Sequence, residues 1–271
     1  MSKDLATLAW LVEMGADEAI GDRPIDRLAP PPPATPKLPA PPDTTAALAL
    51  LPVAASPGPP LPSAQAAASA EALAAAARSL DELEAALRGF DGCALKATAT
   101  STVFADGVPG SRLMLVGEAP GADEDRLGRP FVGVSGQLLD TMLRWIGLER
   151  ARDFYIANVV YWRPPGNRQP TTAEISICLP FIRRQIELAK PEILVFLGNS
   201  AAQALLGTTG GIGRLRGRWL AYRPPGTGRE LQAMATFHPA YLLRSPAQKR
   251  ESWRDLLMIK NKLSGQANEL K

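Results

Sequence analysis

The segment GEAPGADED, residues 117–125, follows an apolar run directly and combines turn-forming residues with carboxylates. Its glycines and proline suit a tight turn that brings backbone N–H groups close to a ligand. Glu118 and Asp125 are carboxylates that could act as a base or orient a water molecule. A plain strand-to-helix connection could have the same composition, so this segment alone does not decide between a structural and a chemical role.

A glycine-rich segment follows at residues 128–137, GRPFVGVSGQ, and contains one aromatic residue, Phe131. This phenylalanine could simply belong to the hydrophobic core. An aromatic ring on a glycine-rich loop is also how proteins provide a stacking surface for a nucleic-acid base. The segment therefore has a structural and a functional interpretation.

Asn158 interrupts the otherwise apolar run FYIANVVYW at residues 154–162. A buried amide must satisfy its hydrogen-bonding groups. It can do so through a structural hydrogen bond to a neighbouring loop or by binding a polar ligand. The loop RPPGNRQP, residues 163–170, comes next, and its Arg163 and Arg168 could contact phosphates.

The last such segment, FHPAYLLR at residues 237–244, contains the only histidine in the chain, His238. A lone histidine is either structural or catalytic. The residues that follow it, Leu242, Leu243 and Arg244, are typical of a basic and apolar insert into a DNA groove.

Apolar runs that are typical of strands precede these segments, at residues 113–119, 154–162, 193–198 and 231–237. Amphipathic stretches lie between them, the clearest over residues 138–146. This alternation predicts an α/β fold around a parallel sheet. Ligands bind at the carboxyl ends of the strands in open sheets of this kind, and each polar segment lies at such an end.

Four regions are expected along the chain. The pattern of residues 1–28 predicts an amphipathic helix, and the composition of residues 29–66 predicts a disordered linker rich in proline and alanine. A helix over residues 67–88 is expected to lead into the domain, which spans residues 89–271. The first helix could bind a protein partner at the end of its tether, or it could pack back on the domain, and we favour the second arrangement.

The charge of the chain is uneven. Residues 1–88 carry 6 basic and 11 acidic residues, a net charge of −5, whereas residues 89–271 carry 24 basic and 16 acidic residues, a net charge of +8. Such a basic excess attracts a phosphate backbone, although many basic domains bind no nucleic acid. No run approaches the ~20 apolar residues of a spanning helix, and there is no secretory leader pattern. Two cysteines are too few for a secreted disulfide framework, so we expect a cytoplasmic protein without membrane contact. We also expect it to be a monomer.

Together, the segments resemble the family 4 uracil-DNA glycosylases over about residues 89–262, because four motifs occur in that family's order. The resemblance implies a three-layer α/β/α sandwich with a four-stranded parallel sheet, and hydrolysis of the N-glycosidic bond of a flipped-out uracil in DNA base excision repair. It also implies site roles. Phe131 would stack on uracil, Asn158 would read its Watson–Crick edge, Glu124 would lie near C5 and exclude thymine, and His238 would face the leaving base.

The group that activates water differs from better-known uracil glycosylases, which have an aspartate where this chain has Ala119. Alanine cannot act as a base, so we expect Ala119 only to contact the substrate and Glu118 to position water. Two alternatives remain: a catalytically silent DNA-binding module of the same fold, or a relative with another base preference, such as hypoxanthine.

The resemblance also implies a [4Fe–4S] cluster held by four cysteines, since such clusters are ordinarily Cys₄-ligated. The corresponding positions here read Phe90, Cys93, Trp162 and Cys178. Because two of the four thiolates are missing, we predict that the chain has no metal or other cofactor. We further predict that the two aromatic rings pack beside the two cysteines.

Overall fold

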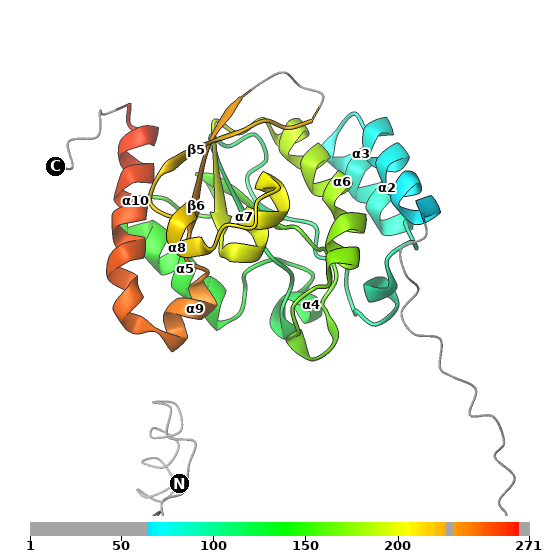
Figure 1. Ribbon diagram of the computed structural model, residues 1–271, viewed down its shortest axis with the longest axis horizontal. Coiled ribbons are helices and arrows are strands. Elements are labelled where there is room, and N and C mark those ends of the chain that lie inside the picture. The colour runs from blue at the N-terminus through cyan, green and yellow to red at the C-terminus, as the bar shows by residue number, and fades with distance from the viewer. Residues whose placement is uncertain (1–63, 226–229, 266–271) are drawn as a thin grey trace, which may run out of the picture. The chain divides into compact units, whose positions relative to one another are not determined.

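A six-stranded sheet in the order β1-β3-β2-β4-β6-β5 lies at the centre of the computed structural model, which describes residues 64–225 and 230–265 (Figure 1). The four central strands run parallel: β2 (Leu113–Gly117), β3 (Phe154–Asn158), β4 (Ile193–Leu197) and β6 (Leu231–Thr236). The short edge strands β1 (Asp106–Gly107) and β5 (Trp219–Tyr222) pair antiparallel. The predicted parallel sheet is confirmed, with one strand added at each edge.

The carboxyl ends of the central strands lie level with one another. Gly117 at the end of β2 pairs with Asn158 at the end of β3, and Leu197 at the end of β4 pairs with Thr236 at the end of β6. Every residue of β2, β3 and β4 is buried, which is expected of parallel strands covered on both faces. The loops that follow these strands therefore meet at one edge of the sheet.

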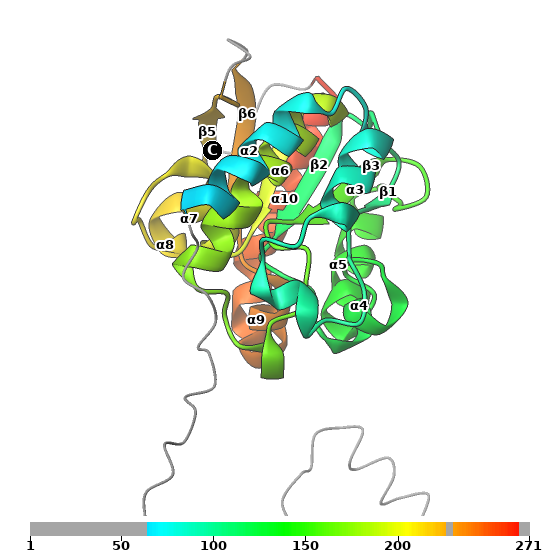
Figure 2. The ribbon, with the colours of Figure 1, turned by 90° about the vertical axis from the view of Figure 1, so that its right-hand side faces the viewer.

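Helices cover both faces of the sheet, so the predicted three-layer α/β/α sandwich is confirmed (Figures 1 and 2). On one face, a buried cluster joins the sheet to α2 (Ala64–Ala76), α3 (Leu80–Gly89), α6 (Thr172–Ala189) and α7 (Asn199–Leu206). On the other, a second cluster joins it to α5 (Val134–Trp145), α9 (Pro239–Arg244) and α10 (Lys249–Leu263). The short helices α4 (Ala122–Leu127) and α8 (Ile212–Leu215) lie in the connections.

The single helix expected over residues 67–88 is in fact two helices, α2 and α3. Ser79 begins the second helix, because its side-chain oxygen accepts a hydrogen bond from the N–H of Glu82. The carbonyl of Ala77, just after α2, accepts hydrogen bonds from the Arg184 guanidinium on α6 at 2.7 and 2.9 Å. These contacts replace the helical bonds that would have made the helix continuous.

The helix expected over residues 1–28 and the linker expected up to residue 63 lie outside the described residues. In the part of the chain that is described, no helix is both long and apolar enough to cross a membrane.

Candidate active site

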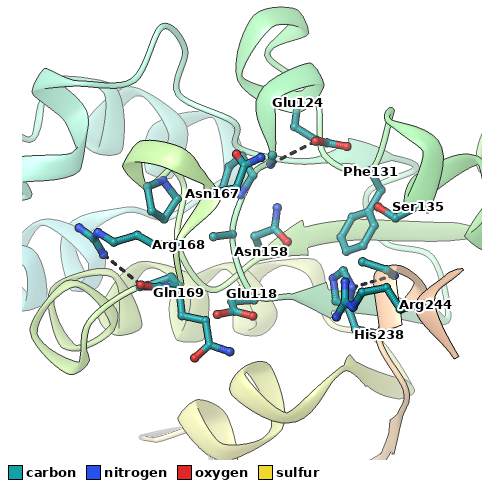
Figure 3. Close-up of a pocket in the computed structure, with 16 residues that line it drawn as sticks. Glu118, Glu124, Phe131, Ser135, Asn158, Asn167, Arg168, Gln169, His238 and Arg244 are labelled. Atoms are coloured by element: carbon teal, nitrogen blue, oxygen red, sulfur yellow. Dashed lines mark hydrogen bonds between the residues drawn. The ribbon is translucent and has the colours of Figure 1, made fainter. Parts of the chain in front are cut away.

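A pocket of about 370 Å³ lies at the carboxyl ends of the central strands (Figure 3). It contains eight of the residues proposed from the sequence, together with others from the same loops. The lining residues are Glu118, Ala119, Pro120, Gly121, Glu124, Phe131, Ser135, Asn158, Pro164, Asn167, Arg168, Gln169, Pro170, His238, Ala240 and Arg244.

Phe131 forms one wall of this pocket, and its ring centroid lies 5.7 Å from that of His238. The ring also lies close to the end of β2, because a Cβ atom built on Gly117 would be 2.4 Å from its Cζ atom. The backbone of Phe131 has a φ of 54°, in the left-handed region that residues with side chains rarely adopt. Such a conformation costs about 1–3 kcal/mol unless neighbouring contacts hold it.

Asn158 ends strand β3 and is almost fully buried, with 1% of its surface exposed. Its Oδ1 atom has no hydrogen-bond partner among the described residues. A Cβ atom on Gly117 would lie 2.5 Å from this oxygen, so the neighbouring glycine leaves the space beside it open. A buried acceptor without a partner requires a donor from a ligand or a water molecule, and the side chain lies among the other pocket residues in Figure 3.

The Glu124 carboxylate accepts three hydrogen bonds from backbone N–H groups, at 3.1 Å from Gly121 and 2.9 Å from both Val132 and Gly133. It therefore ties the turn after β2 to the glycine-rich loop that carries Phe131. This positioning role comes in addition to the contact near C5 of the base that the resemblance implies.

Asp125, the alternative carboxylate for activating water, is excluded by its position. Its Oδ1 accepts hydrogen bonds from the N–H groups of Thr100 and Ser101 at 2.8 and 2.9 Å, and it does not line the pocket. Glu118 does line it, and its Oε1 atom is buried with no hydrogen-bond partner among the residues described. Burial raises the pKa of the Glu118 carboxyl, although a hydrogen bond with Ser200 partly offsets this.

His238 precedes helix α9, and its Nδ1 atom accepts a hydrogen bond from the N–H of Ala240 at 3.2 Å. Burial, helped by the positive charge of Arg244, lowers the pKa of His238 to about 4, against a smaller opposite effect of Glu124. The ring is therefore neutral near pH 7. Because Nδ1 is the acceptor, the proton of the neutral ring is assigned to Nε2.

The two arginines after β3, which were expected to contact phosphates, both have hydrogen-bond partners within the protein. Arg168 forms a bidentate ion pair with Glu174, at 2.7 and 2.9 Å, which offsets its charge. Arg163 donates from Nε to Oδ1 of Asn167 at 2.7 Å and does not line the pocket.

Leu242 and Leu243 were both assigned to DNA contact, with one or the other expected to enter the duplex, and only Leu243 is available for that role. Leu242 has no exposed surface and belongs to the hydrophobic core beneath α9, so the expectation that it reaches DNA is wrong. Leu243 is 41% exposed beside Arg244. Adjacent positions on a helix point about 100° apart, so packing one leucine inward turns the other outward.

Three polar residues that line the pocket were not singled out from the sequence: Ser135, Asn167 and Gln169. All three lie within the segments 128–137 and 163–170. Only their position within those segments could have indicated that they line the pocket, because neither their residue types nor their spacing distinguishes them from other polar loop residues.

The four positions expected to replace cluster ligands all belong to one buried cluster. The Cys93 and Cys178 thiols are hydrogen-bonded to each other, which lowers the pKa of Cys93 and raises that of Cys178. Phe90 packs against Phe181 with ring centroids 5.3 Å apart, and Trp162 donates from Nε1 to the Thr102 hydroxyl at 3.0 Å.

Comparison with known proteins gives a consistent result. Residues 104–257 match the model of the uracil DNA glycosylase superfamily. The type-4 uracil-DNA glycosylase of Pyrobaculum aerophilum is 39% identical over 184 residues, which is 66% of this chain and 92% of the relative. That of Archaeoglobus fulgidus is 38% identical over 186 residues, 66% of this chain and 91% of the relative. That of Thermotoga maritima is 41% identical over 157 residues, 56% of this chain and 77% of the relative.

These relatives overturn the prediction that the cluster is absent. They are type-4 uracil-DNA glycosylases, and resemblance to that family implies a [4Fe–4S] cluster. The loss of two of the four cysteine ligands was therefore not sufficient ground for predicting that the cluster is absent. The described side chains at the four positions supply two thiols and no third ligand, and they do not by themselves fit a four-thiolate cluster.

Proposed function

This chain belongs to the uracil-DNA glycosylase superfamily, and from this premise we propose that its pocket removes uracil from DNA by hydrolysing the N-glycosidic bond. The observation that supports this function best is the grouping of Glu118, Phe131, Asn158 and His238 around one pocket at the carboxyl ends of the sheet. DNA is its binding partner, and the base must leave the stack to reach so recessed a site.

Asn158 would recognise the base. Its unpartnered Oδ1 would accept a hydrogen bond from uracil N3–H, and its NH₂ group would donate to O4. Cytosine presents the reversed donor and acceptor pattern, and a mismatched buried edge is costly. Phe131 would stack on the face of the base, and Glu124 would hold the two loops that enclose it.

His238 would stabilise the leaving group. As the bond between C1′ and N1 breaks, its electron pair passes to the base, and negative charge builds on O2. The Nε2–H group of a neutral imidazole can donate a hydrogen bond to that oxygen, as donors of an oxyanion hole do.

Glu118 would orient the attacking water. The water oxygen bonds to C1′ while the sugar has oxocarbenium character, and the carboxylate accepts the proton that the water loses. The buried Oε1 without a partner supports this role, and the raised pKa makes Glu118 a better base than an exposed carboxylate. Ala119 would contact the substrate without taking part in proton transfer.

The DNA backbone would lie along the basic and apolar rim of the pocket. Arg244 lines the pocket, Arg163 lies on the loop after β3, and Leu243 is exposed beside Arg244. Arg168 would contribute less to phosphate binding, because Glu174 already neutralises its charge.

Excision assays with matched oligonucleotides test the proposal. The purified protein should release uracil from uracil-containing DNA and leave otherwise identical DNA with hypoxanthine or no lesion intact. Preferential release of hypoxanthine would instead indicate a different base preference. Binding without release of any base would identify a silent DNA-binding module.

We also propose that the protein acts as a monomer, since the pocket of a single chain already contains each residue to which recognition of the base or catalysis is assigned above. Residues 1–28 would take no part in catalysis and, although we favour a helix that packs on the domain, could offer a surface to a protein partner. A chain lacking residues 1–63 should then retain the excision rate on naked DNA, and light scattering should give the mass of one chain with and without DNA. Loss of activity in the shortened chain would assign these residues to catalysis or folding.

A further inference from the structure

Arg150, in the turn after α5, makes five hydrogen bonds although no motif includes it. Two of them reach consecutive carbonyl groups of the glycine-rich loop: Nη1 donates to the Pro130 oxygen and Nη2 to the Phe131 oxygen, both at 2.7 Å. The other three go to the carboxylates of Asp106 on β1 and Asp140 on α5. All five N–H groups of the guanidinium can therefore be satisfied at once.

The two carbonyls that accept from one guanidinium flank the peptide at Phe131, the residue with the left-handed backbone conformation. Helix α5 packs closely beneath the same peptide, since a Cβ atom on Gly136 would lie 2.0 Å from the Phe131 oxygen. Hydrogen bonds from a charged donor are stronger than neutral ones. The contacts from Arg150 thus favour the one backbone conformation that places the ring of Phe131 in the pocket.

The two carboxylates fix the guanidinium in turn. The Arg150 side chain is 13% exposed, and its pairs with Asp106 and Asp140 measure 3.0 and 2.9 Å. Burial raises the pKa of the Asp106 carboxyl, but hydrogen bonds from Arg150, Gly107 and Arg129 outweigh this and hold the pKa below its ordinary value. Asp106 therefore stays charged at neutral pH as a partner for the arginine.

We propose that Arg150 is a positioning residue for base excision, acting through Phe131: it holds the Phe131 backbone so that the ring meets the face of the extruded base. This inference rests on the proposed function, and it concerns a residue that touches neither the base nor the DNA. If Arg150 only stabilised the fold, replacing it would lower the excision rate by the same factor whether or not the Phe131 ring is present. If Arg150 acts through Phe131, the loss should disappear once the ring is removed.

A double-mutant cycle tests the coupling. Single-turnover excision of uracil is measured for the full-length wild type, Arg150→Met, Phe131→Ala and the double variant. Misplacing a group in an active site by about 1 Å can slow a reaction about 10²-fold, so Arg150→Met should lower the rate about 10- to 100-fold. The double variant should be no slower than Phe131→Ala alone, because the arginine has nothing left to position.

Arg152→Met is the matched control, because Arg152 lies two residues away, is 64% exposed and, among the residues that the structure describes, forms ion pairs only with Glu149 and Asp153. It should retain the wild-type rate. Arg150→Lys keeps the charge but has three donors and no planar fork, so it should recover thermal stability more fully than the excision rate. This variant also provides the test if Arg150→Met fails to fold.

Rate losses that multiply in the double variant would overturn the proposal, as would a wild-type rate in Arg150→Met or a full rescue of the rate by lysine. A wild-type protein without activity on uracil would instead overturn the proposed function, before any variant is compared.

Discussion

The Nδ1 atom of His238 accepts a hydrogen bond from the backbone N–H of Ala240 at 3.2 Å. This contact leaves Nε2 as the nitrogen that carries the proton, while burial keeps the ring neutral by lowering its pKa to about 4. A neutral donor oriented in advance needs no proton transfer before it can stabilise charge on the departing base.

Replacing His238 with alanine should slow the chemical step about 10²-fold or more, by comparison with removal of one oxyanion-hole donor. Single-turnover kinetics at saturating enzyme measure this step directly. DNA affinity, measured on an abasic oligonucleotide, should change little. A variant that loses only affinity would place His238 among the structural residues.

The acid side of the pH–rate profile should belong to Glu118. Its pKa is raised above 4.5 by burial, so the carboxylate becomes protonated, and the rate falls, as the pH drops through that raised value. Glu118→Gln should be slow at every pH and should lack this fall. Its residual rate should stay level down to about pH 4, where His238 acquires its proton. An unchanged acid limb in the glutamine variant would remove Glu118 from the role of base.

Asn158→Ala should nearly abolish excision while affinity for DNA stays within a few-fold, because Asn158 contacts the base and the basic rim contacts the backbone. Excision and equilibrium binding are measured on the same uracil-containing oligonucleotide. Thermal melting serves as the control for folding, because the side chain is buried. Retention of most of the activity would refute a base-reading role.

The four parallel strands could be predicted because apolar residues dominate each of them and nearly all of their residues are buried. Strands β2 and β4 contain no polar side chain, whereas β3 ends in Asn158 and β6 contains Gln232 and Thr236. The edge strands could not. Strand β1 has two residues, and β5 is an apolar run of only four residues, WLAY, which is at the short limit of what a sequence pattern can distinguish from a loop.

In the site, Phe131, Asn158 and His238 could be predicted because each stands out in type from its neighbours. Arg150 could not, because its significance comes from carbonyl groups 19 and 20 residues away in the chain. The separate fates of Leu242 and Leu243 depend on how α9 is rotated against the core, which their sequence does not reveal.

Replacing each of these adjacent leucines with alanine should affect stability at Leu242 and base excision at Leu243. Leu242→Ala should lower the free energy of unfolding by about 2–5 kcal/mol, because it leaves a cavity in the core. Leu243→Ala should change that free energy by less than about 0.5 kcal/mol, because its side chain is exposed at the surface and its removal leaves no enclosed cavity. Urea unfolding measures both values.

Excision should respond in the reverse order. A side chain that fills the space of an extruded nucleotide helps only when a base must leave a paired stack, at a cost of a few kcal/mol. Leu243→Ala should therefore slow excision from duplex DNA on the order of 10-fold and from single-stranded DNA much less. Folded Leu242→Ala protein, assayed well below its melting temperature, should keep the wild-type ratio of duplex to single-stranded rates. An equal loss on both substrates in Leu243→Ala would show that this leucine does not act as a wedge.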